Sequence, residues 1–307
     1  MTRSLPLGLA LLIATASCAA MRAQTPTPQV AFTFDDLPAH GPLPPGEFRP
    51  EPMRSILKTL KKENMPPVYG FVNGFRTAQY PYQTELLREW IASGNALGNH
   101  TWSHPPFDQT SAKKFIANIA KDEPILQKVD PDGDWHWFRY PYLQEGNTLA
   151  KRIAVRNYLL NHHYQIAEVT IDFEDSLWNE PYARCMAKQN NVAVASLEKS
   201  YIAVADEYIG VFRTLSQKLY GNDIPYVLLL HVGAFDAHML PQLIALFRER
   251  GFQFIALPQA ESDPAYAFDP KIGYLSGGTL QELTAAVRKV NFPDNTKPYK
   301  RLDRMCR

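Results

Sequence analysis

Cysteine is scarce in this chain of 307 residues, which contains only three, and the formal net charge of +1 is close to zero. Such a charge gives no reason to expect a nucleic acid or an anionic membrane surface as a partner. Beyond the N-terminal segment, no stretch is long and apolar enough to cross a membrane as a helix. Internal repeats and low-complexity segments are also absent from the sequence. With 45% hydrophobic residues, the chain can still bury one sizeable core.

The N-terminal segment has the pattern of an export signal. Arg3 is followed by an apolar run over Leu5–Ala16, which is too short to span a bilayer, and small residues come next. We therefore expect residues 1–23 to be a signal peptide that is removed from a periplasmic or secreted protein. The alternative is a lipoprotein in which Cys18 is the lipidated residue, although the residues before it match that signal poorly.

The two cysteines that remain after such processing are Cys185 and Cys306. In an oxidising compartment they could form one disulfide that ties the C-terminal tail to the body of the protein. They could equally be two unrelated thiols, one of them in a frayed tail. The sequence does not decide between these alternatives.

Apolar runs alternate with helical segments along residues 24–260. The expected strands are 30–34, 67–72, 95–98, 135–140, 166–171, 226–232 and 252–257. The expected helices are 52–64, 84–93, 111–129, 148–162, 187–219 (as two helices), 239–250 and 279–290. This alternation predicts an α/β fold with parallel strands. Candidate polar groups follow five of the strands, which favours a distorted, incomplete (β/α)7-type barrel, because a barrel brings its strand ends to one mouth. Residues 261–307 are predicted to be an extension that packs on the barrel or trails from it.

Asp35 and Asp36 end the first expected strand. Two adjacent carboxylates are costly to bury unless a cation or a proton takes up their charge. His100 and His104 are four positions apart, a spacing that places both side chains on one face of a helical turn. One carboxylate and two imidazoles suit a catalytic Zn²⁺ or a related divalent ion. Taken singly, each pattern has a common structural explanation, such as a helix cap or an exposed helical face.

Four motifs, in order and at whole-domain spacing, resemble those of the polysaccharide deacetylases of the NodB-homology type (carbohydrate esterase family 4). They are Thr33-Phe34-Asp35-Asp36, His100-Thr101-Trp102-Ser103-His104, Arg139-Tyr140-Pro141-Tyr142 and Leu229-Leu230-His231. The resemblance covers roughly residues 28–260. A further family motif, D-x-x-D-W, is matched in its carboxylates by Asp172 and Asp175, but Trp178 comes two positions late. The region from residue 179 to residue 223 is long for the gap between these motifs, so a helical cap or an oligomer contact is expected there, including the helical insert at 187–219.

The resemblance implies the NodB-like deacetylase fold and a metal-dependent hydrolase that removes acetyl groups from N-acetylated glycans. Chitin oligosaccharides and peptidoglycan are the substrates considered, and O-acetylated glycans are a second option. Asp36, His100 and His104 would bind the metal, with Zn²⁺ as the default and Co²⁺, Mn²⁺ or Fe²⁺ as alternatives. The resemblance leaves the oligomeric state open.

The remaining roles also follow from the resemblance. Asp35 would be the general base, with Arg139 keeping it ionised, and the backbone N–H of Tyr142 would be an oxyanion donor. His231 would protonate the departing amine, oriented by Asp175. The candidates for substrate binding are Tyr140, Trp178 and Leu229.

Two other hypotheses stay open. The same metal site could hydrolyse a non-sugar amide or ester, or the protein could be an inactive glycan-binding protein that kept the fold. An inactive protein would be expected to have lost a ligand or the base, and none is missing here. His40 follows the Asp pair closely and could contact substrate, but we expect it at the surface.

Overall fold

The structure is a computed structural model that describes residues 27–292 and 299–307. The expected signal peptide and Cys18 lie outside the described residues. Within those two ranges, no helix combines the length and the apolar character needed to cross a membrane.

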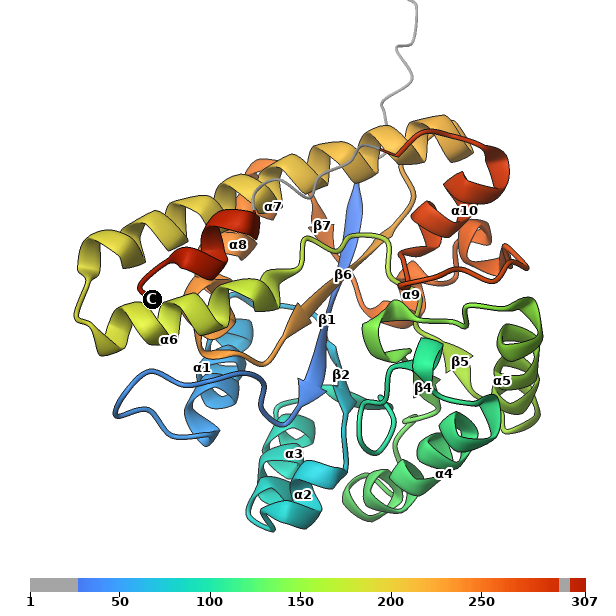
Figure 1. Ribbon diagram of the computed structural model, residues 1–307, viewed down its shortest axis with the longest axis horizontal. Coiled ribbons are helices and arrows are strands. Elements are labelled where there is room, and N and C mark those ends of the chain that lie inside the picture. The colour runs from blue at the N-terminus through green and yellow to red at the C-terminus, as the bar shows by residue number, and fades with distance from the viewer. Residues whose placement is uncertain (1–26, 293–298) are drawn as a thin grey trace, which may run out of the picture.

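A curled parallel sheet forms the centre of the molecule (Figure 1). Within the described residues its strands are β1 (Gln29–Leu37), β2 (Tyr69–Val72), β3 (Ala96–Asn99), β4 (Trp137–Phe138), β5 (Gln165–Ile166), β6 (Tyr226–His231) and β7 (Gln253–Phe254). The order is β5-β4-β3-β2-β1-β6, and β7 pairs with the start of β1. Beyond β5, Ile171 makes an isolated parallel bridge to Leu228 of β6, which brings the two edges together. The prediction of an incomplete, distorted (β/α) barrel is confirmed.

Strand β1 organises the barrel because both of its faces are buried. Such a strand is expected to read as a nearly continuous apolar run. Its outer face carries Phe32, whose ring meets Phe247 of a covering helix at 5.2 Å between centroids. Because side chains alternate along a strand, Thr33 and Asp35 point to the opposite, inner face. The same alternation therefore supplies both the packing and the polar groups at the barrel mouth.

Helices surround the sheet (Figure 1). They are α1 (Pro50–Lys62), α2 (Phe75–Gln79), α3 (Gln83–Ala92), α4 (Ala112–Val129), α5 (Leu149–Asn161), α6 (Asn179–Ala187), α7 (Asn191–Tyr220), α8 (Ala234–Glu249), α9 (Leu257–Ala260) and α10 (Leu280–Arg288). The short helices α2, α6 and α9 correspond to none of the predicted helices. The strands expected at 135–140, 166–171 and 252–257 shrink to two residues each.

The prediction of two helices over 187–219 is wrong, because α7 is one helix of 30 residues. Asn190 caps its start by accepting a hydrogen bond from the backbone N–H of Ala193. Its end is set by Gly221, whose φ of 81° suits glycine and stops the helix. A long buried stripe, including Tyr201 and Phe212, packs α7 against α6, α8 and α10.

The segment after residue 261 packs on the barrel and reaches the loop that follows β4. Tyr274 and Gly278 donate backbone hydrogen bonds to the carbonyl oxygens of Gly146 and Leu143, at 3.0 and 3.3 Å. Gly277 adopts a φ of 77°, and a Cβ at this position would lie 2.2 Å from the carbonyl oxygen of Tyr142. This close approach requires glycine and brings the extension against the loop that carries Tyr142.

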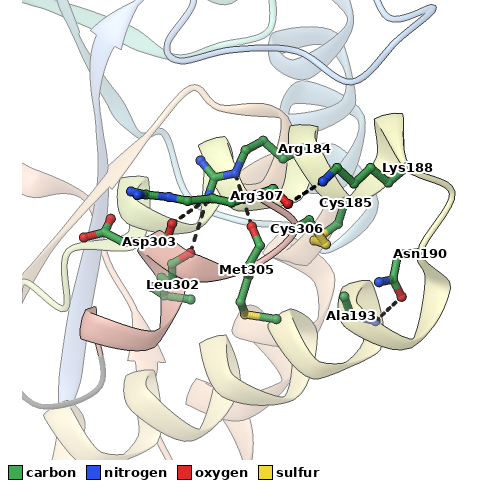
Figure 2. Close-up of a disulfide and its surroundings, with 10 residues drawn as sticks. All are labelled: Arg184, Cys185, Lys188, Asn190, Ala193, Leu302, Asp303, Met305, Cys306 and Arg307. Carbon is green, nitrogen blue, oxygen red and sulfur yellow. Dashed lines mark hydrogen bonds between the residues drawn. A yellow bond between two sulfur atoms is a disulfide. The ribbon is translucent and has the colours of Figure 1, made fainter.

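A disulfide joins Cys185 of α6 to Cys306 (Figure 2). Around it, the Arg184 guanidinium donates to the carbonyl oxygens of Met305 and Leu302, and the Lys188 ammonium donates to that of Arg307. Of the two alternatives that the sequence left open, the structure contains the disulfide, and it ties the C-terminal tail to α6.

Reducing this disulfide is expected to lower the free energy of unfolding by about 2–4 kcal/mol. The bond closes a loop across a sequence separation of 121, and a closed loop of this size restricts the unfolded chain strongly. Urea unfolding of the oxidised and reduced protein measures the difference. The variant Cys185→Ser should unfold like the reduced protein and should not respond to reductant; equal midpoints for all three samples would contradict the prediction.

Candidate active site and metal centre

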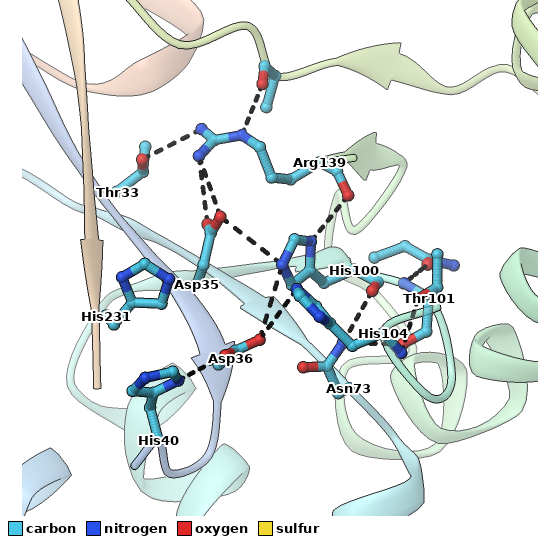
Figure 3. Close-up of polar contacts among 12 residues, drawn as sticks. Thr33, Asp35, Asp36, His40, Asn73, His100, Thr101, His104, Arg139 and His231 are labelled. Atoms are coloured by element: carbon cyan, nitrogen blue, oxygen red, sulfur yellow. Dashed lines mark hydrogen bonds and ion pairs between the residues drawn. The ribbon is translucent and has the colours of Figure 1, made fainter. Parts of the chain in front are cut away.

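A cleft of about 1050 Å³ opens where several strands end. Its floor is built by residues at the ends of β1 and β6 and in the turn after β3, namely Asp35, Asp36, His231, His100 and His104. One wall comes from the C-terminal extension, including Tyr274 and Gly277. Segments that are far apart in the sequence therefore meet around one hollow (Figure 3).

Three candidate metal ligands converge in this cleft. The Oδ1 atom of Asp36 lies 3.7 Å from Nε2 of His100 and 3.5 Å from Nε2 of His104. Oδ1 is buried and has no hydrogen-bond partner among the described residues. Ligands about 2.0–2.2 Å from a tetrahedral Zn²⁺ lie roughly 3.3–3.6 Å from one another. Both distances from Oδ1 are close to this spacing, and the three atoms all lie within 4.8 Å of one another. The unpartnered Oδ1 is therefore a candidate ligand atom.

Hydrogen bonds orient His100 toward this point. Because a carbonyl oxygen can only accept, Nδ1 donates to the carbonyl oxygen of Arg139 at 2.8 Å, and Nε2 is the ring nitrogen that faces Asp36. Metal-binding histidines commonly have such an outer partner. The side-chain amide of Asn73 donates to the carbonyl oxygens of His100 and Thr101, at 2.8 and 3.1 Å, and fixes the backbone of the turn.

The backbone around the candidate metal site is strained. Asp36, Thr101 and His104 have φ values of 63°, 68° and 53°, in the left-handed region that non-glycine residues seldom adopt. Each such residue costs of order 1–3 kcal/mol, which the surrounding structure must offset. Strain of this kind concentrates where side chains must be aimed at one point, and here it falls on two of the three candidate ligands.

Electrostatics place two of the candidate ligands in their metal-binding protonation states. Burial, together with the neighbouring His100, lowers the pKa of His104 to about 3, so the imidazole is neutral at pH 7. Burial alone would raise the pKa of Asp36, but the hydrogen bond and charge of His40 hold that pKa well below its usual value. A neutral imidazole and an ionised carboxylate are the forms that bind metal.

Asp35 lies beside the metal ligands and is held by Arg139. One guanidinium nitrogen of Arg139, Nη1, lies 3.2 Å from Oδ1 of Asp35, and Nη2 donates to Oγ1 of Thr33 at 3.1 Å. Nε donates to the carbonyl oxygen of Ala167 at 2.7 Å. The second carboxylate oxygen of Asp35 faces His100, at 3.7 Å from Nε2. Arg139 thus fixes a buried carboxylate next to the ligand cluster without entering it.

His231 at the end of β6 is paired with the fully buried Asp175. Its Nδ1 lies 2.8 Å from one carboxylate oxygen of Asp175, and its backbone N–H donates to the other at 2.7 Å. Burial alone would lower the pKa of His231, but the charge and hydrogen bond of Asp175, with the charges of Asp36 and Asp35, raise it to about 10. A cationic imidazole with Nδ1 occupied by Asp175 presents Nε2–H as a proton donor.

Replacing Asp175 by Asn should move the alkaline limb of the kcat profile to lower pH. The Asp175 carboxylate is the chief group that raises the pKa of His231 to about 10, above the ordinary 6.5. A proton donor acts only below its pKa, so the wild type should stay active further into alkaline pH than the variant. Steady-state kinetics from pH 6 to 10 measure the limb, and an unchanged profile in Asp175→Asn would exclude this role for Asp175.

Most of the predicted site residues meet at the cleft. Tyr142 and Leu229 line it, and the Tyr142 ring lies 4.4 Å from that of His104. Two substrate-binding predictions are wrong. Tyr140 is 2% exposed and stacks on Phe115 in the core, so it does not line the cleft.

Trp178 is the second of these corrections. Its indole is fully buried, donates from Nε1 to Oγ of Ser200 at 2.9 Å, and packs edge-on against Tyr201 of α7. Trp178 comes two positions later than the tryptophan of the family motif, and at this position its ring packs in the core under α7. It therefore cannot form the wall of a sugar groove.

Sequence reasoning missed several residues that reach the cleft. His40, expected at the surface although it could contact substrate, is partly exposed, lines the cleft and lies with Nδ1 2.6 Å from Oδ2 of Asp36. The signal available was its spacing of four residues from Asp36. Burial raises the pKa of Asp172, also in the cleft, to about 7. Tyr274 and Glu282 enter from the extension, where the sequence shows no motif.

The fold and the site together define a barrel protein in whose cleft one carboxylate and two imidazoles converge. Residues 22–159 match the model of the family described as polysaccharide deacetylase. This match and the curated relatives support the resemblance of the chain to polysaccharide deacetylases of the NodB-homology type (carbohydrate esterase family 4). The matched range contains the three candidate metal ligands, Asp35 and Arg139, whereas Asp175 and His231 lie beyond it.

Curated relatives cover different shares of the chain. The peptidoglycan-N-acetylmuramic acid deacetylase of Bacillus subtilis is 34% identical over 100 residues, which are 33% of this chain and 18% of that protein. The peptidoglycan-N-acetylglucosamine deacetylase of Bacillus cereus is 25% identical over 230 residues, 75% of this chain and 67% of that protein. The first of these matches thus spans less than a fifth of the relative's own length.

Solved structures show the same fold. A pseudoenzyme of carbohydrate esterase family 4 from Bacillus anthracis aligns with a TM-score of 0.53 at 14% identity. The alignment covers 76% of this chain and 66% of that one. The coverage exceeds that of the family model, so the likeness in fold extends past residue 159.

Proposed function

We propose that this protein is a metal-dependent deacetylase that removes acetyl groups from N-acetylated glycans, with chitin oligosaccharides and peptidoglycan as the first candidates and O-acetyl groups as a second option. The observation that carries the proposal is the convergence of a complete site in one cleft. The site comprises three candidate metal ligands, one of which is the unpartnered Oδ1 of Asp36. Beside them lie the buried carboxylate of Asp35 and the hydrogen-bonded pair of His231 and Asp175. The names of the relatives, which act on sugars of peptidoglycan, support the substrate class.

Asp36, His100 and His104 would hold one divalent ion, for which Zn²⁺ is the default because its usual ligands are imidazole and carboxylate. Co²⁺, Mn²⁺ and Fe²⁺ accept the same donor set and remain alternatives. When bound, the ion supplies Lewis acidity to the acetyl carbonyl and to the attacking water, whose pKa such ions lower to about 7.

The protein groups divide the proton transfers between them. Asp35 takes the proton of the attacking water, and its ion pair with Arg139 keeps its carboxylate available for this role. The water oxygen then bonds to the carbonyl carbon, and the backbone N–H of Tyr142 is proposed to donate to the oxyanion. His231 gives its Nε2 proton to the departing nitrogen as the carbon–nitrogen bond breaks, which releases acetate and a free amine.

Substrate contacts are proposed for residues that line the cleft. Leu229 lies two residues before His231 on the same face of β6, and both line the cleft. Leu229 is therefore placed to contact the acetyl methyl group. Tyr142 is 56% exposed beside His104 and offers an aromatic face to a sugar ring. The walls supplied by the extension would bound the sugar on the other side.

Export to the periplasm or the outside of the cell is part of the proposal. It rests on the N-terminal pattern, which lies outside the described residues, and the lipoprotein alternative through Cys18 stays open. The Cys185–Cys306 disulfide supports an oxidising compartment, because such bonds seldom persist in the cytosol.

Acetate release from a panel of substrates tests the proposal. The panel compares chitin oligosaccharides of graded length, peptidoglycan, acetylated xylan and small non-sugar acetamides, each with the purified, Zn²⁺-loaded protein. Release from a glycan supports the proposal and identifies the substrate class. Release from the small amides alone would move the function to a non-sugar amide or ester, and binding of glycan without any release would indicate a glycan-binding protein.

A further inference from the structure

His40 stands where the two halves of the site meet. Its backbone N–H donates to the carbonyl oxygen of Val232 at 2.8 Å, so the loop after β1 is fixed to the end of β6. The imidazole lines the cleft, and 23% of the side chain remains exposed. Figure 3 shows this ring directly below that of His231, with Asp36 to its upper right. None of the motifs in the sequence includes His40.

The first contact of His40, a hydrogen bond to Asp36, gives the two carboxylate oxygens of Asp36 different surroundings. Nδ1 of His40 lies 2.6 Å from Oδ2, whereas Oδ1 has no hydrogen-bond partner among the described residues and faces His100 and His104. A carboxylate whose Oδ2 accepts a hydrogen bond cannot rotate freely and presents Oδ1 alone to an ion. Outer partners of this kind orient metal ligands, and their loss typically weakens metal binding by about 10–100-fold.

The second contact of His40 is with the ring of His231. The two ring centroids lie 4.7 Å apart, with an angle of 46° between the planes. Asp175 holds Nδ1 of His231 at 2.8 Å, and the ring of His40 packs against the imidazole, so two neighbours limit its rotation. A displacement of His231 would move its Nε2 away from the departing nitrogen.

We propose that His40 is a positioning residue that aims Asp36 at the metal and His231 at the leaving group. The first half of this role concerns metal binding alone, and the second half rests on the proposed function. The atoms of Asp36, His40 and His231 also lie within 4.8 Å of one another and form a second set that could hold an ion. We assign no ion there, because Nδ1 of His40 and Oδ2 of Asp36 are already hydrogen-bonded to each other at 2.6 Å.

Two variants separate the two contacts. His40→Phe keeps a ring against His231 but removes the donor to Asp36, whereas His40→Asn keeps a donor and removes the ring. The metal-free full-length proteins are titrated with Zn²⁺ in competition with a chromophoric chelator, with no substrate present. We expect His40→Phe to bind Zn²⁺ about 10–100-fold more weakly than wild type and His40→Asn to retain most of the affinity. His163→Asn, at an exposed position far from any motif, is the control and should match wild type.

Kinetics on Zn²⁺-saturated proteins test the second contact. We expect His40→Asn, which lacks the ring, to lower kcat with little change in KM although its metal affinity is retained. His40→Phe, which keeps a ring against His231, should stay close to wild type once it is saturated with Zn²⁺. Wild-type Zn²⁺ affinity in His40→Phe would overturn the proposal. So would a wild-type stoichiometry of two ions that falls to one in both variants, which would make His40 a ligand. If the wild type releases no acetate, the proposed function fails, while the affinity comparison still decides the first half of the role.

Discussion

Asp35→Asn is expected to lower kcat by roughly 10²–10⁴-fold, the range that a general base contributes, while the protein keeps its bound metal. The carboxylate is buried beside the ligand cluster, 3.2 Å from Arg139, and it is not one of the three candidate ligands. Asparagine has nearly the same shape and still accepts a hydrogen bond from Arg139, but it cannot take a proton from water. Steady-state acetate release and metal analysis on the same preparation measure the two quantities.

Two controls keep this result interpretable. Asp132→Asn makes the same chemical change at an exposed position and should leave kcat and metal content unchanged. Asp35→Asn leaves the buried Arg139 with a neutral partner, and an unfolded variant would also be inactive. Urea unfolding therefore checks that the variant is folded. Loss of metal from a folded Asp35→Asn protein would contradict the assignment and would make Asp35 a ligand.

His104→Ala is expected to lose both metal and activity. His104 supplies one of the three ligand atoms of the proposed metal site, and its imidazole is neutral at pH 7 because burial, with the neighbouring His100, lowers its pKa to about 3. Removing a direct ligand should weaken metal binding beyond the roughly 10–100-fold cost of losing an outer partner. Activity should then fall to background at metal concentrations that saturate the wild type.

The comparison with Asp35→Asn makes the His104 result specific. One variant should be inactive with metal bound, and the other should be inactive because metal is absent. His162→Ala, at the exposed end of α5, is the matched histidine control and should behave as wild type. A His104→Ala protein with wild-type metal content and full activity would show that His104 is not a ligand.

Local patterns were sufficient to predict the barrel and the centre of the site. A nearly continuous apolar run predicts the buried strand β1, and the carboxylates at its end lie at the barrel mouth because parallel strands all end on that side. The pair His100 and His104 was found by its spacing. The centre of the site could therefore be predicted from local patterns and the order of the motifs, without knowledge of which distant segments are in contact.

Residues placed by long-range packing could not be predicted in this way. Trp178 and Tyr140 were expected near the substrate because they lie in or near motifs, yet packing against α7 and against Phe115 draws them into the core. Gly277 meets the Tyr142 loop through a close backbone approach between segments more than a hundred residues apart, and no local pattern records this. The prediction of two helices in place of α7 is wrong for the same reason. The helix packs along its length on α6, α8 and α10, and no local pattern records these contacts.

Chelation and restoration of metal test the central claim most directly. The purified protein is assayed for acetate release from the best glycan of the substrate panel as isolated, after chelation, and after addition of Zn²⁺ or Co²⁺. The account predicts that release stops on chelation, returns with metal, and is accompanied by one bound ion per chain in wild type but none in His104→Ala. Acetate release that continues in the fully metal-free protein would contradict it, because the cluster of Asp36, His100 and His104 would then have no part in the reaction.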